Sequence, residues 1–284
     1  MNDRRSEPAT RALAADREHL AEIALLTAHE AGQLVSSGYR SRPSFERKAP
    51  QDLLTEYDLA SQEMLVSRLQ SLAPGIPVVA EEGALGGAEP SGSGRRSGLV
   101  WYVDPLDGTT NFVHGHPFWC VAVGLAQDNQ PIVGAIVAPA LGLSWMGWVG
   151  DRATPGGTRR NGEPCSVSTV DAVTDALVAT GFPTERDRAP ADNFDSFVRV
   201  KRAVQGVRRC GSAAMDLCLV ADGPYDAYWE RKLHAWDVVA GGALVRAAGG
   251  RVSSLDGGEP DWQIGHVIAS NGRIHDDLVR LVNG

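Results

Sequence analysis

Two acidic residues, Asp104 and Asp107, follow directly on the apolar run 99–103. That run has the length and the β-branched and aromatic content of a buried strand, so we expect both carboxylates where the strand ends and a loop begins. Together with the Leu106 carbonyl they supply three hard oxygen donors, which magnesium prefers. Residues 108–110 can open a helix whose free N–H groups would donate hydrogen bonds to a phosphate.

The same string has a plainer interpretation. An Asp-Pro turn is common in loops, and a second aspartate often caps the N-terminus of the helix that follows. On that interpretation Asp104 and Asp107 shape a turn and bind nothing. The motif alone does not decide between the two, so the other acids of the chain must be considered.

Two further acidic segments precede this motif. Thr55 and Asp58 have the spacing of a capping pair that starts a helix over 59–72, so helix capping is an alternative role for Asp58. Residues 77–80 are typical of a short strand, and Glu81 follows at its end, where binding groups often gather. Adjacent glutamates are also common in solvated loops, which leaves both interpretations open.

A last acid, Asp237, lies in the first turn of a helix expected over 235–244. The helix dipole favours a carboxylate there even without a metal. His234 has no partner at a metal-ligand spacing, so we expect it to pack. The one concentration of basic residues in the second half of the chain has two possible roles, a solvated helix face and strand edge or a binding site for phosphate or a partner. It comprises Arg199, Lys201, Arg202, Arg208 and Arg209.

Composition limits the classes of function. The chain has 284 residues, 43% hydrophobic and 22% charged, with a net charge of −8, which disfavours a general nucleic-acid binder. Four cysteines form no C-x-x-C pair, so we expect reduced thiols and no zinc motif. The N-terminus does not fit a secretory signal and no run is long enough to span a membrane, which predicts a cytoplasmic protein without membrane contact.

The remaining pattern predicts two joined halves. Strands expected over 118–126, 132–138 and 143–149 with short connections indicate an antiparallel meander, followed by a Gly/Arg-rich loop over 156–162. We therefore expect an N-terminal α+β half, residues 1–170, that carries most of the acids, and a C-terminal α/β half, residues 171–284, that completes the site. In the N-terminal half we further expect a helix over 10–36, a basic loop over 40–50 and a flexible flap over 84–97. In the C-terminal half we expect strands over 176–180, 207–210, 225–229 and 251–253, and helices over 193–205 and 212–221.

Taken together, four segments resemble the inositol monophosphatase family of magnesium-dependent, lithium-sensitive phosphatases. They are DLLTEYD ending at Asp58, VVAEEG with Glu81, WYVDPLDGTTNF, and WERKLHAWDVVAGG with Asp237, in the family's order. The resemblance runs from about residue 13 to residue 281. It implies a fold of mixed α+β and α/β character, a layered αβαβα sandwich of the sugar-phosphatase type. It also makes a homodimer an expectation.

The resemblance also implies roles for individual residues. Asp58 and Thr109 match the pair that orients the attacking water. Two or three Mg²⁺ ions would be held by side chains and one carbonyl, matched by Glu81, Asp104, Leu106, Asp107 and Asp237, with Glu81 counted among the catalytic residues as well. Substrate contacts match Gly108, Thr109, Thr110, Gly211, Ser212, Ala213 and Glu230.

The chain departs from the family pattern where substrates are selected. Residues 145–160 keep little of the usual strand and loop, and residues 85–98 match poorly. We expect hydrolysis of a small polyol phosphate, with inositol monophosphate as the first choice because of Glu230. Relatives with the same acids hydrolyse fructose 1,6-bisphosphate, histidinol phosphate or 3′-phosphoadenosine 5′-phosphate. A regulatory protein that keeps the fold and acts through partners is the alternative from another class.

Overall fold

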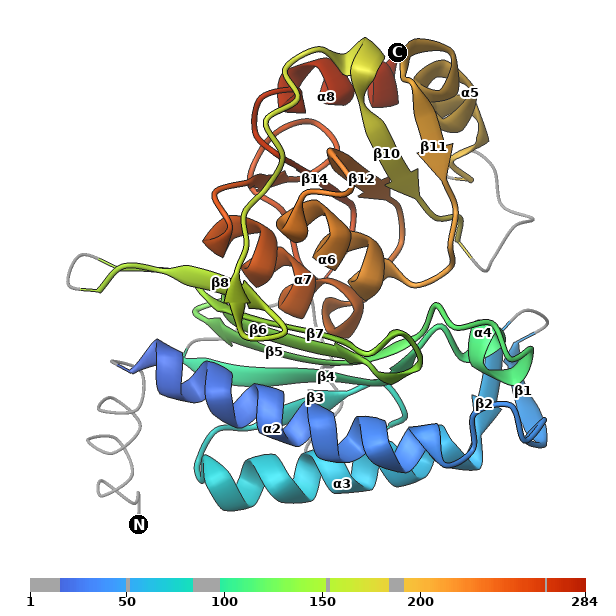
Figure 1. The fold of residues 1–284 in the computed structure, drawn as a ribbon, viewed down its shortest axis with the longest axis vertical. Coiled ribbons are helices and arrows are strands. Elements are labelled where there is room, and N and C mark those ends of the chain that lie inside the picture. Colours follow the sequence, from blue (N-terminus) through green and yellow to red (C-terminus); the bar gives the residue numbers. More distant parts are fainter. Residues whose placement is uncertain (1–15, 50–51, 84–97, 152–153, 184–191, 264) are drawn as a thin grey trace.

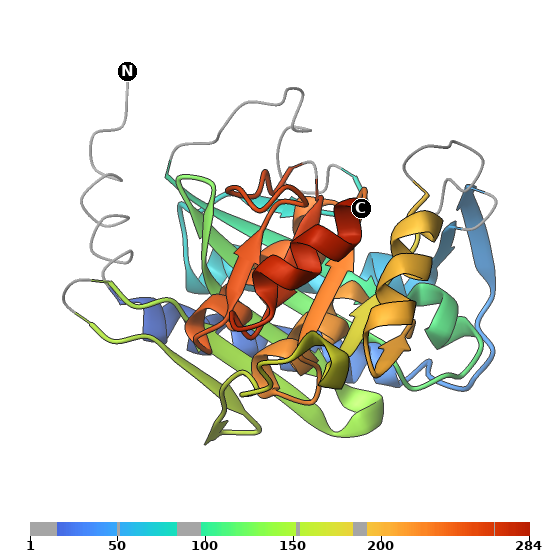
Figure 2. The same cartoon turned by 90° about the horizontal axis from the view of Figure 1, so that it is seen from above.

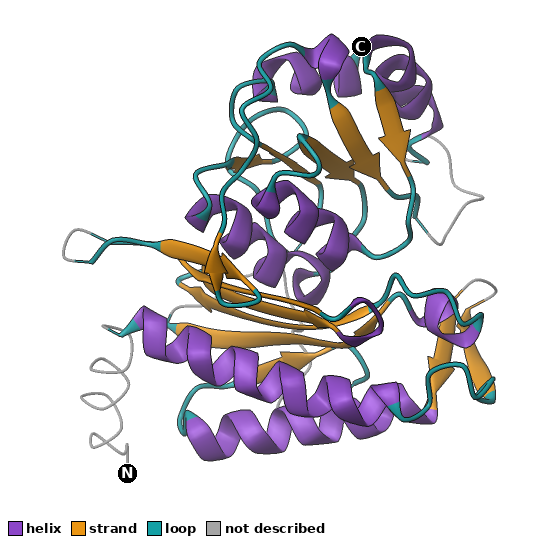
Figure 3. Cartoon of the chain, viewed as in Figure 1, coloured by secondary structure: helices purple, strands orange, loops and turns teal. Residues whose placement is uncertain are grey.

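The chain folds into five stacked layers (Figure 1). The computed structural model describes residues 16–49, 52–83, 98–151, 154–183, 192–263 and 265–284. From one side to the other the layers are a helix pair, a seven-stranded sheet, a second helix pair, a five-stranded sheet and a last helix pair, as the colouring by secondary structure makes plain (Figure 3). The predicted αβαβα sandwich is confirmed. Among the described helices, none combines the length and the apolar character needed to cross a bilayer.

The first layer consists of α2 (Arg17–Ser36) and α3 (Glu56–Leu72). Asp16 caps α2 by accepting a hydrogen bond from the His19 N–H at 3.0 Å, and the helix ends at Ser36 as expected. The predicted start at residue 10 lies outside the described residues. The capping pair of Thr55 and Asp58 is confirmed, but α3 begins at Glu56 and not at 59, because Thr55 is itself the N-cap.

The second layer is a sheet in the order β3-β4-β5-β6-β7-β8-β9, and the expected antiparallel meander forms its centre. The predicted loop over 156–162 is wrong, since β8 pairs antiparallel with β7. A glycine- and arginine-rich segment at a sheet margin lacks the alternation that would mark it as a strand. The strands are β3 (Val78–Ala80), β4 (Leu99–Asp107), β5 (Cys120–Gln127), β6 (Gln130–Ala138), β7 (Leu143–Trp148), β8 (Gly157–Arg160) and β9 (Glu163–Pro164).

Strand β4 extends through the acidic motif, whereas the sequence predicted that it would end at residue 103. Asp104 lies opposite Ala122 and Asp107 opposite Cys120, so two residues of β4 face one of β5 in between. Such a bulge accommodates Pro105, which has no N–H for the ladder. Both aspartates are therefore fixed by strand pairing and not by a loop. The short helix α4 (Thr109–Val113) follows at once.

A two-stranded hairpin lies beside α4, and its first strand occupies residues 45–49 of the basic loop that we expected over 40–50 (Figure 1). It consists of β1 (Phe45–Ala49) and β2 (Asp52–Thr55), which pair antiparallel. All five residues of β1 are exposed. A strand that buries neither face has no hydrophobic period, so no sequence pattern indicated it.

The C-terminal half supplies the other three layers. Helices α6 (Ala213–Asp222) and α7 (Ala235–Ala247) lie between the two sheets, and α5 (Phe194–Ala203) packs beside α8 (His275–Asn283) on the outer face (Figure 2). The sheet order is β11-β10-β12-β14-β13, with β10 parallel to both neighbours and β14 antiparallel to both of its own. The strands are β10 (Leu177–Thr180), β11 (Gly206–Arg208), β12 (Ala227–Glu230), β13 (Arg251–Ser253) and β14 (Val267–Ser270). Sequence reasoning missed β14 and α8.

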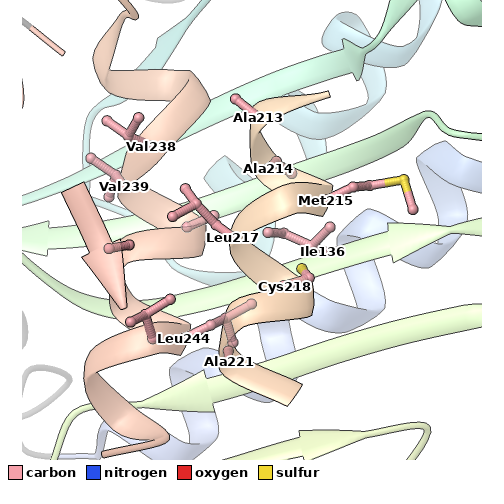
Figure 4. Close-up of a cluster of buried hydrophobic side chains, with 14 of the residues drawn as sticks. Ile136, Ala213, Ala214, Met215, Leu217, Cys218, Ala221, Val238, Val239 and Leu244 are labelled. Atoms are coloured by element: carbon pink, nitrogen blue, oxygen red, sulfur yellow. The ribbon is translucent and has the colours of Figure 1, made fainter. Parts of the chain in front are cut away.

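The helix pair α6 and α7 joins the two halves through a common apolar core. Side chains such as Leu217 and Leu244 pack together over Ile136 of β6 (Figure 4). Helix α7 sits directly on the sheet, because a Cβ added at Gly134 would lie 2.1 Å from the Ala240 carbonyl oxygen. The four cysteines are free thiols. Cys120 and Cys218 are buried, and Cys165 and Cys210 are partly buried.

Candidate active site

A pocket of about 530 Å³ opens where the hairpin, the end of β4, α4 and the C-terminal half meet. Its lining includes five acids, Asp52 of the hairpin and the four that the sequence singled out, Glu81, Asp104, Asp107 and Asp237. A larger but more open hollow of about 730 Å³ lies near Arg246 and Glu259, and it contains none of the acids singled out by the sequence. Chemistry and not volume therefore identifies the candidate site.

Strand pairing and a helix start bring the four acids together. Strand β3 runs parallel to β4 with Ala80 opposite Val103, so Glu81 and Asp104 follow in register at the same edge. Asp237 enters from the first turn of α7, where its Oδ2 accepts the His234 N–H at 2.7 Å. Capping and pocket lining are compatible for Asp237, because the His234 N–H takes up only one of its two oxygens.

The pocket concentrates negative charge away from water. Burial raises the pKa of Asp104 well above its usual value, and the charges of Glu81, Asp107 and Asp237 raise it further. The pKa of Asp237 is also raised well above the ordinary value, by burial first and then by Glu81. Burial raises the pKa of Asp107 to about 6, although hydrogen bonds from Ser212 and Ala214 oppose the shift. Such acids ionise readily only when a cation compensates them.

The donor set fits a hard divalent cation. It consists of carboxylates and the Leu106 carbonyl, the oxygen ligands that Mg²⁺ selects. In the described part of the chain, however, no three His, Cys, Asp or Glu side chains already surround one point as ligands. One reason is visible at Glu81, whose Oε1 lies 2.8 Å from the ammonium group of Lys48.

Asp58 and Thr109 are brought together as the resemblance implies. The Thr109 hydroxyl lies 3.0 Å from Asp58 Oδ1 and 3.0 Å from the Leu106 carbonyl oxygen, and its single hydrogen can serve one of them at a time. Asp58 Oδ2 accepts the Thr55 N–H at 2.8 Å. Burial raises the pKa of Asp58 and outweighs these bonds. Asp58 thus caps α3 and also contacts a pocket residue.

The turn at Gly108 joins the two halves beside the acids. Its φ is +91°, and a Cβ there would lie 3.0 Å from the Phe118 carbonyl oxygen and 3.4 Å from that of Gly211, so only glycine fits without strain. The Asn111 side-chain amide donates to the Phe118 and Cys210 carbonyls at 2.7 and 2.9 Å. The pocket is lined by Gly108, Thr109, Thr110 and Gly211.

The other expected substrate contacts lie behind the pocket wall in this structure. Ser212 and Ala213 are absent from its lining, and the Ser212 hydroxyl donates to Asp107 Oδ2 at 2.7 Å. Glu230 was expected in a loop, but it ends β12 because strand pairing with Val267 continues to that residue. It is buried, and the Tyr228 hydroxyl donates to its Oε2. Burial raises the pKa of Glu230 to about 7.

The structure divides the basic group. Arg209 is exposed and lines the pocket, whereas Arg199 donates to the Val282 carbonyl at 2.6 Å and is absent from the lining. Sequence reasoning missed Asp216, which is buried with Oδ1 unpartnered, and burial with the nearby Glu230 raises its pKa well above the ordinary value. No local signal marks Asp216, because its position depends on long-range packing. His234 stacks on Trp236 with ring centroids 4.6 Å apart, in keeping with a packing role.

Comparisons with known proteins agree with this geometry. The model of the inositol monophosphatase family matches residues 16–283. Inositol-1-monophosphatase of Synechocystis sp. is 38% identical over 80% of this chain and 75% of its own, and the Nus factor SuhB of Pseudomonas aeruginosa is 33% identical over 92% and 94%. The solved inositol monophosphatase from Anabaena (Nostoc) superposes with a TM-score of 0.81 at 33% identity, covering 94% of this chain and 96% of that one. The chain therefore belongs to the inositol monophosphatase family and is a phosphoric monoester hydrolase.

Proposed function

We propose that this enzyme hydrolyses a small polyol phosphate monoester with the help of magnesium, and that inositol monophosphate is its substrate. The observation that carries the proposal is the convergence of Glu81, Asp104, Asp107 and Asp237 on one pocket, where burial and mutual repulsion raise the pKa of Asp104 and Asp237. An uncompensated buried charge of this kind is costly unless a cation binds it. The name of the Synechocystis relative supports inositol phosphate as the substrate.

Two or three Mg²⁺ ions would be held by the residues that the family resemblance indicates, Glu81, Asp104, the Leu106 carbonyl, Asp107 and Asp237. When bound, magnesium lowers the pKa of a coordinated water and neutralises charge on the attacking and leaving oxygens. The Ser212 hydroxyl and the Ala214 N–H, each 2.7 Å from Asp107 Oδ2, fix that carboxylate while its Oδ1 remains for other contacts. Positioning of this type tunes a ligand's affinity.

The remaining roles belong to the chain's own polar groups. With its hydrogen donated to Asp58, the Thr109 hydroxyl presents lone pairs that accept a hydrogen from the attacking water and orient it. The first hydrogen bond of α4 runs from the Phe112 N–H to the Gly108 carbonyl, so the N–H groups of Thr109 and Thr110 have no partner within the helix. Together with the Gly108 N–H, they would bind the phosphate oxygens.

The C-terminal half would receive the polyol. We assign the ring hydroxyls to Gly211, Ser212, Ala213 and Glu230, of which Gly211 lines the pocket as it stands. Tyr228 takes up one oxygen of Glu230 and leaves the other for a substrate hydroxyl. On this proposal residues 1–170 carry most of the metal ligands and residues 171–284 complete the site. A homodimer, lithium sensitivity and a cytoplasmic location belong to the same proposal.

A second function has a specific observation in its favour. The Pseudomonas relative is named a Nus factor, which supports a role through protein partners. Substituting Asp104 with Asn separates the two functions: a cellular phenotype that persists in this variant after turnover is lost would support the regulatory role.

The test is phosphate release from a panel of esters, with and without Mg²⁺, by the wild type and by Asp237→Asn. The panel contains inositol 1-phosphate, fructose 1,6-bisphosphate, histidinol phosphate and 3′-phosphoadenosine 5′-phosphate. We expect magnesium-dependent release, fastest from inositol 1-phosphate and lost in the variant. If another ester were hydrolysed fastest, that ester would replace inositol monophosphate as the proposed substrate. If folded protein released phosphate from none of the esters, the partner-binding role would be favoured.

A further inference from the structure

Lys48 forms ion pairs with two neighbouring acids at the edge of the pocket. Its ammonium nitrogen lies 2.8 Å from Glu81 Oε1, 2.7 Å from Glu82 Oε1 and 3.6 Å from Asp52 Oδ1. The Lys48 side chain is 27% exposed, and those of Glu81 and Glu82 are 22% and 5% exposed. An ion pair this sheltered is only weakly screened by solvent. Lys48 is therefore a positive charge held on one of the proposed metal ligands.

The backbone of the hairpin aims Lys48 at this position. The pairing of β1 with β2 shifts register between Arg47 and Ala49, so Lys48 sits at a bulge. A β-bulge redirects the side chain it carries and is frequent beside active sites. Phe45 and Arg47, on the same strand, line the pocket. Movement of Lys48 thus involves the strand that forms one wall of the pocket.

The two glutamates that hold Lys48 differ in their surroundings. Glu82 is fixed by Gln62 of α3, whose Oε1 accepts the Glu82 N–H at 2.8 Å and whose Nε2 donates to the Glu82 carbonyl at 3.2 Å. Gln62 is completely buried, which makes this support rigid. Glu81 lines the pocket, and Glu82 does not. Glu82 can therefore hold Lys48 while the carboxylate of Glu81 turns to another partner.

We propose that Lys48 is an internal cation that bridges Glu81 and Glu82 in the metal-free enzyme, and that it releases Glu81 and keeps only Glu82 when Glu81 binds a divalent metal. The proposal rests on the metal-ligand role of Glu81 put forward above. Exchange of one cation for another keeps the buried charge of Glu81 compensated throughout. It also makes the metal affinity depend on Lys48 and loosens the β1–β2 hairpin at the pocket wall when the metal binds.

The first test measures Mn²⁺ binding by electron paramagnetic resonance, without substrate. Lys48→Met removes the competitor, and we expect the dissociation constant for Mn²⁺ to fall about two- to fivefold, the range of a partly exposed ion pair. Lys48→Arg keeps the charge and should remain close to the wild type. Arg209→Met is the matched control, because it removes a positive charge that lines the same pocket and belongs to the C-terminal half. An equal gain in affinity in Arg209→Met would reduce the effect to general electrostatics and overturn the proposal.

Glu82→Gln should change the affinity for Mn²⁺ in the opposite direction to Lys48→Met. Lys48 then has Glu81 as its closest acid, so Mn²⁺ should bind more weakly than to the wild type. The weakening should be smaller when the same substitution is made together with Lys48→Met, because coupled residues are not additive. If Glu82→Gln weakened Mn²⁺ binding equally in the wild type and in Lys48→Met, the role of Glu82 in holding Lys48 would be contradicted.

Amide hydrogen exchange tests the hairpin directly. We expect faster exchange in β1 and β2 of the wild type when Mg²⁺ is added, and fast exchange with or without Mg²⁺ in Lys48→Met. Exchange in the wild type that does not respond to Mg²⁺ would overturn the displacement. A wild type that binds no Mn²⁺ would instead refute the metal site itself. Normal Mn²⁺ binding with no effect of Lys48→Met would refute the role of Lys48 alone.

Discussion

Two buried regions of the molecule differ in how many hydrogen-bond donors they supply to their aspartates. Asp226, in the C-terminal half, accepts the Ser168 hydroxyl and the Leu177 N–H, one on each carboxylate oxygen and both at 2.6 Å. At the pocket, the described hydrogen bonds give Asp104 one donor, the Leu106 N–H at 3.0 Å, and give Asp237 one, the His234 N–H at 2.7 Å. Asp226 is compensated by the fold, whereas the pocket acids repel one another.

The difference indicates which acids serve structure and which serve function. Around Asp226 the hydrogen bonding continues: Asn271 donates to Ser168 Oγ at 2.9 Å and to the Val170 carbonyl at 2.8 Å. A satisfied buried network of this kind stabilises one conformation. Asp104 and Asp237 instead receive one donor each and keep their remaining oxygen for a cation. Burial alone does not identify a catalytic acid, but burial with few donors and acidic neighbours does so more reliably.

The largest effects, on activity and on stability in opposite directions, are expected from Asp104→Asn. Loss of a metal ligand should lower the rate of phosphate release by about a thousandfold or more. The metal-free variant should nevertheless be more stable than the wild type at pH 7, by roughly 1–3 kcal/mol, because a repelled buried charge is removed. Initial rates and urea unfolding in the presence of EDTA measure the two effects. A metal-free variant less stable than the wild type would contradict the view that the pocket acids are uncompensated.

The reverse outcome is expected from Asp226→Asn. The amide cannot accept from both Ser168 and the Leu177 N–H, so the free energy of unfolding should fall by about 1–3 kcal/mol. Phosphate release per folded molecule should stay within about twofold of the wild type, since Asp226 does not line the pocket. Urea unfolding and rates corrected for folded fraction check this. A large rate defect at unchanged stability would break the distinction between the two regions.

A smaller effect concerns the pH dependence of stability. Burial raises the pKa of Glu230 from 4.5 to about 7, so the unfolded chain releases this proton at a lower pH than the folded chain. Glu230 should therefore destabilise the metal-free protein progressively as pH rises from about 4.5 to 7, by at most on the order of 3 kcal/mol. Glu230→Gln should flatten the stability profile over that window. Unfolding midpoints measured in EDTA at several pH values would show it, and parallel profiles for the two proteins would refute it.

Local signals predicted much of the architecture and the acid set. The apolar run 99–103 and the meander that follows are encoded by hydrophobic pattern, and the Thr55–Asp58 pair by capping chemistry. Glu81, Asp104, Asp107 and Asp237 do lie together in one pocket, and Asp58 contacts Thr109 of its lining. The sequence could bring them together because each lies near the end of a strand or in the first turn of a helix, which fixes it relative to the sheet.

Other features depend on packing that no local pattern encodes. Strand β8 exists because β7 offers a free edge, and β1 buries neither face, so neither has a hydrophobic period. The ion pair of Lys48 with Glu81 joins residues 33 apart, through a bulge whose position no motif marks. Arg209 lines the pocket because the segment that follows β11 lies beside the site in the folded chain. The predicted flap over 84–97 lies outside the described residues, and its role stays a prediction.

Helix α7 carries Asp237 at one end and is buried along most of its length between two sheets, whereas every residue of β1 is exposed at the pocket wall. A substitution in α7 therefore disturbs the core and the acid cluster together, while a substitution in β1 at a position other than Lys48 changes the wall at little cost in stability. A new substrate preference can therefore evolve at these hairpin positions with the least loss of stability. The fold thus separates the part of the enzyme that must be inherited unchanged from the part that is free to diversify.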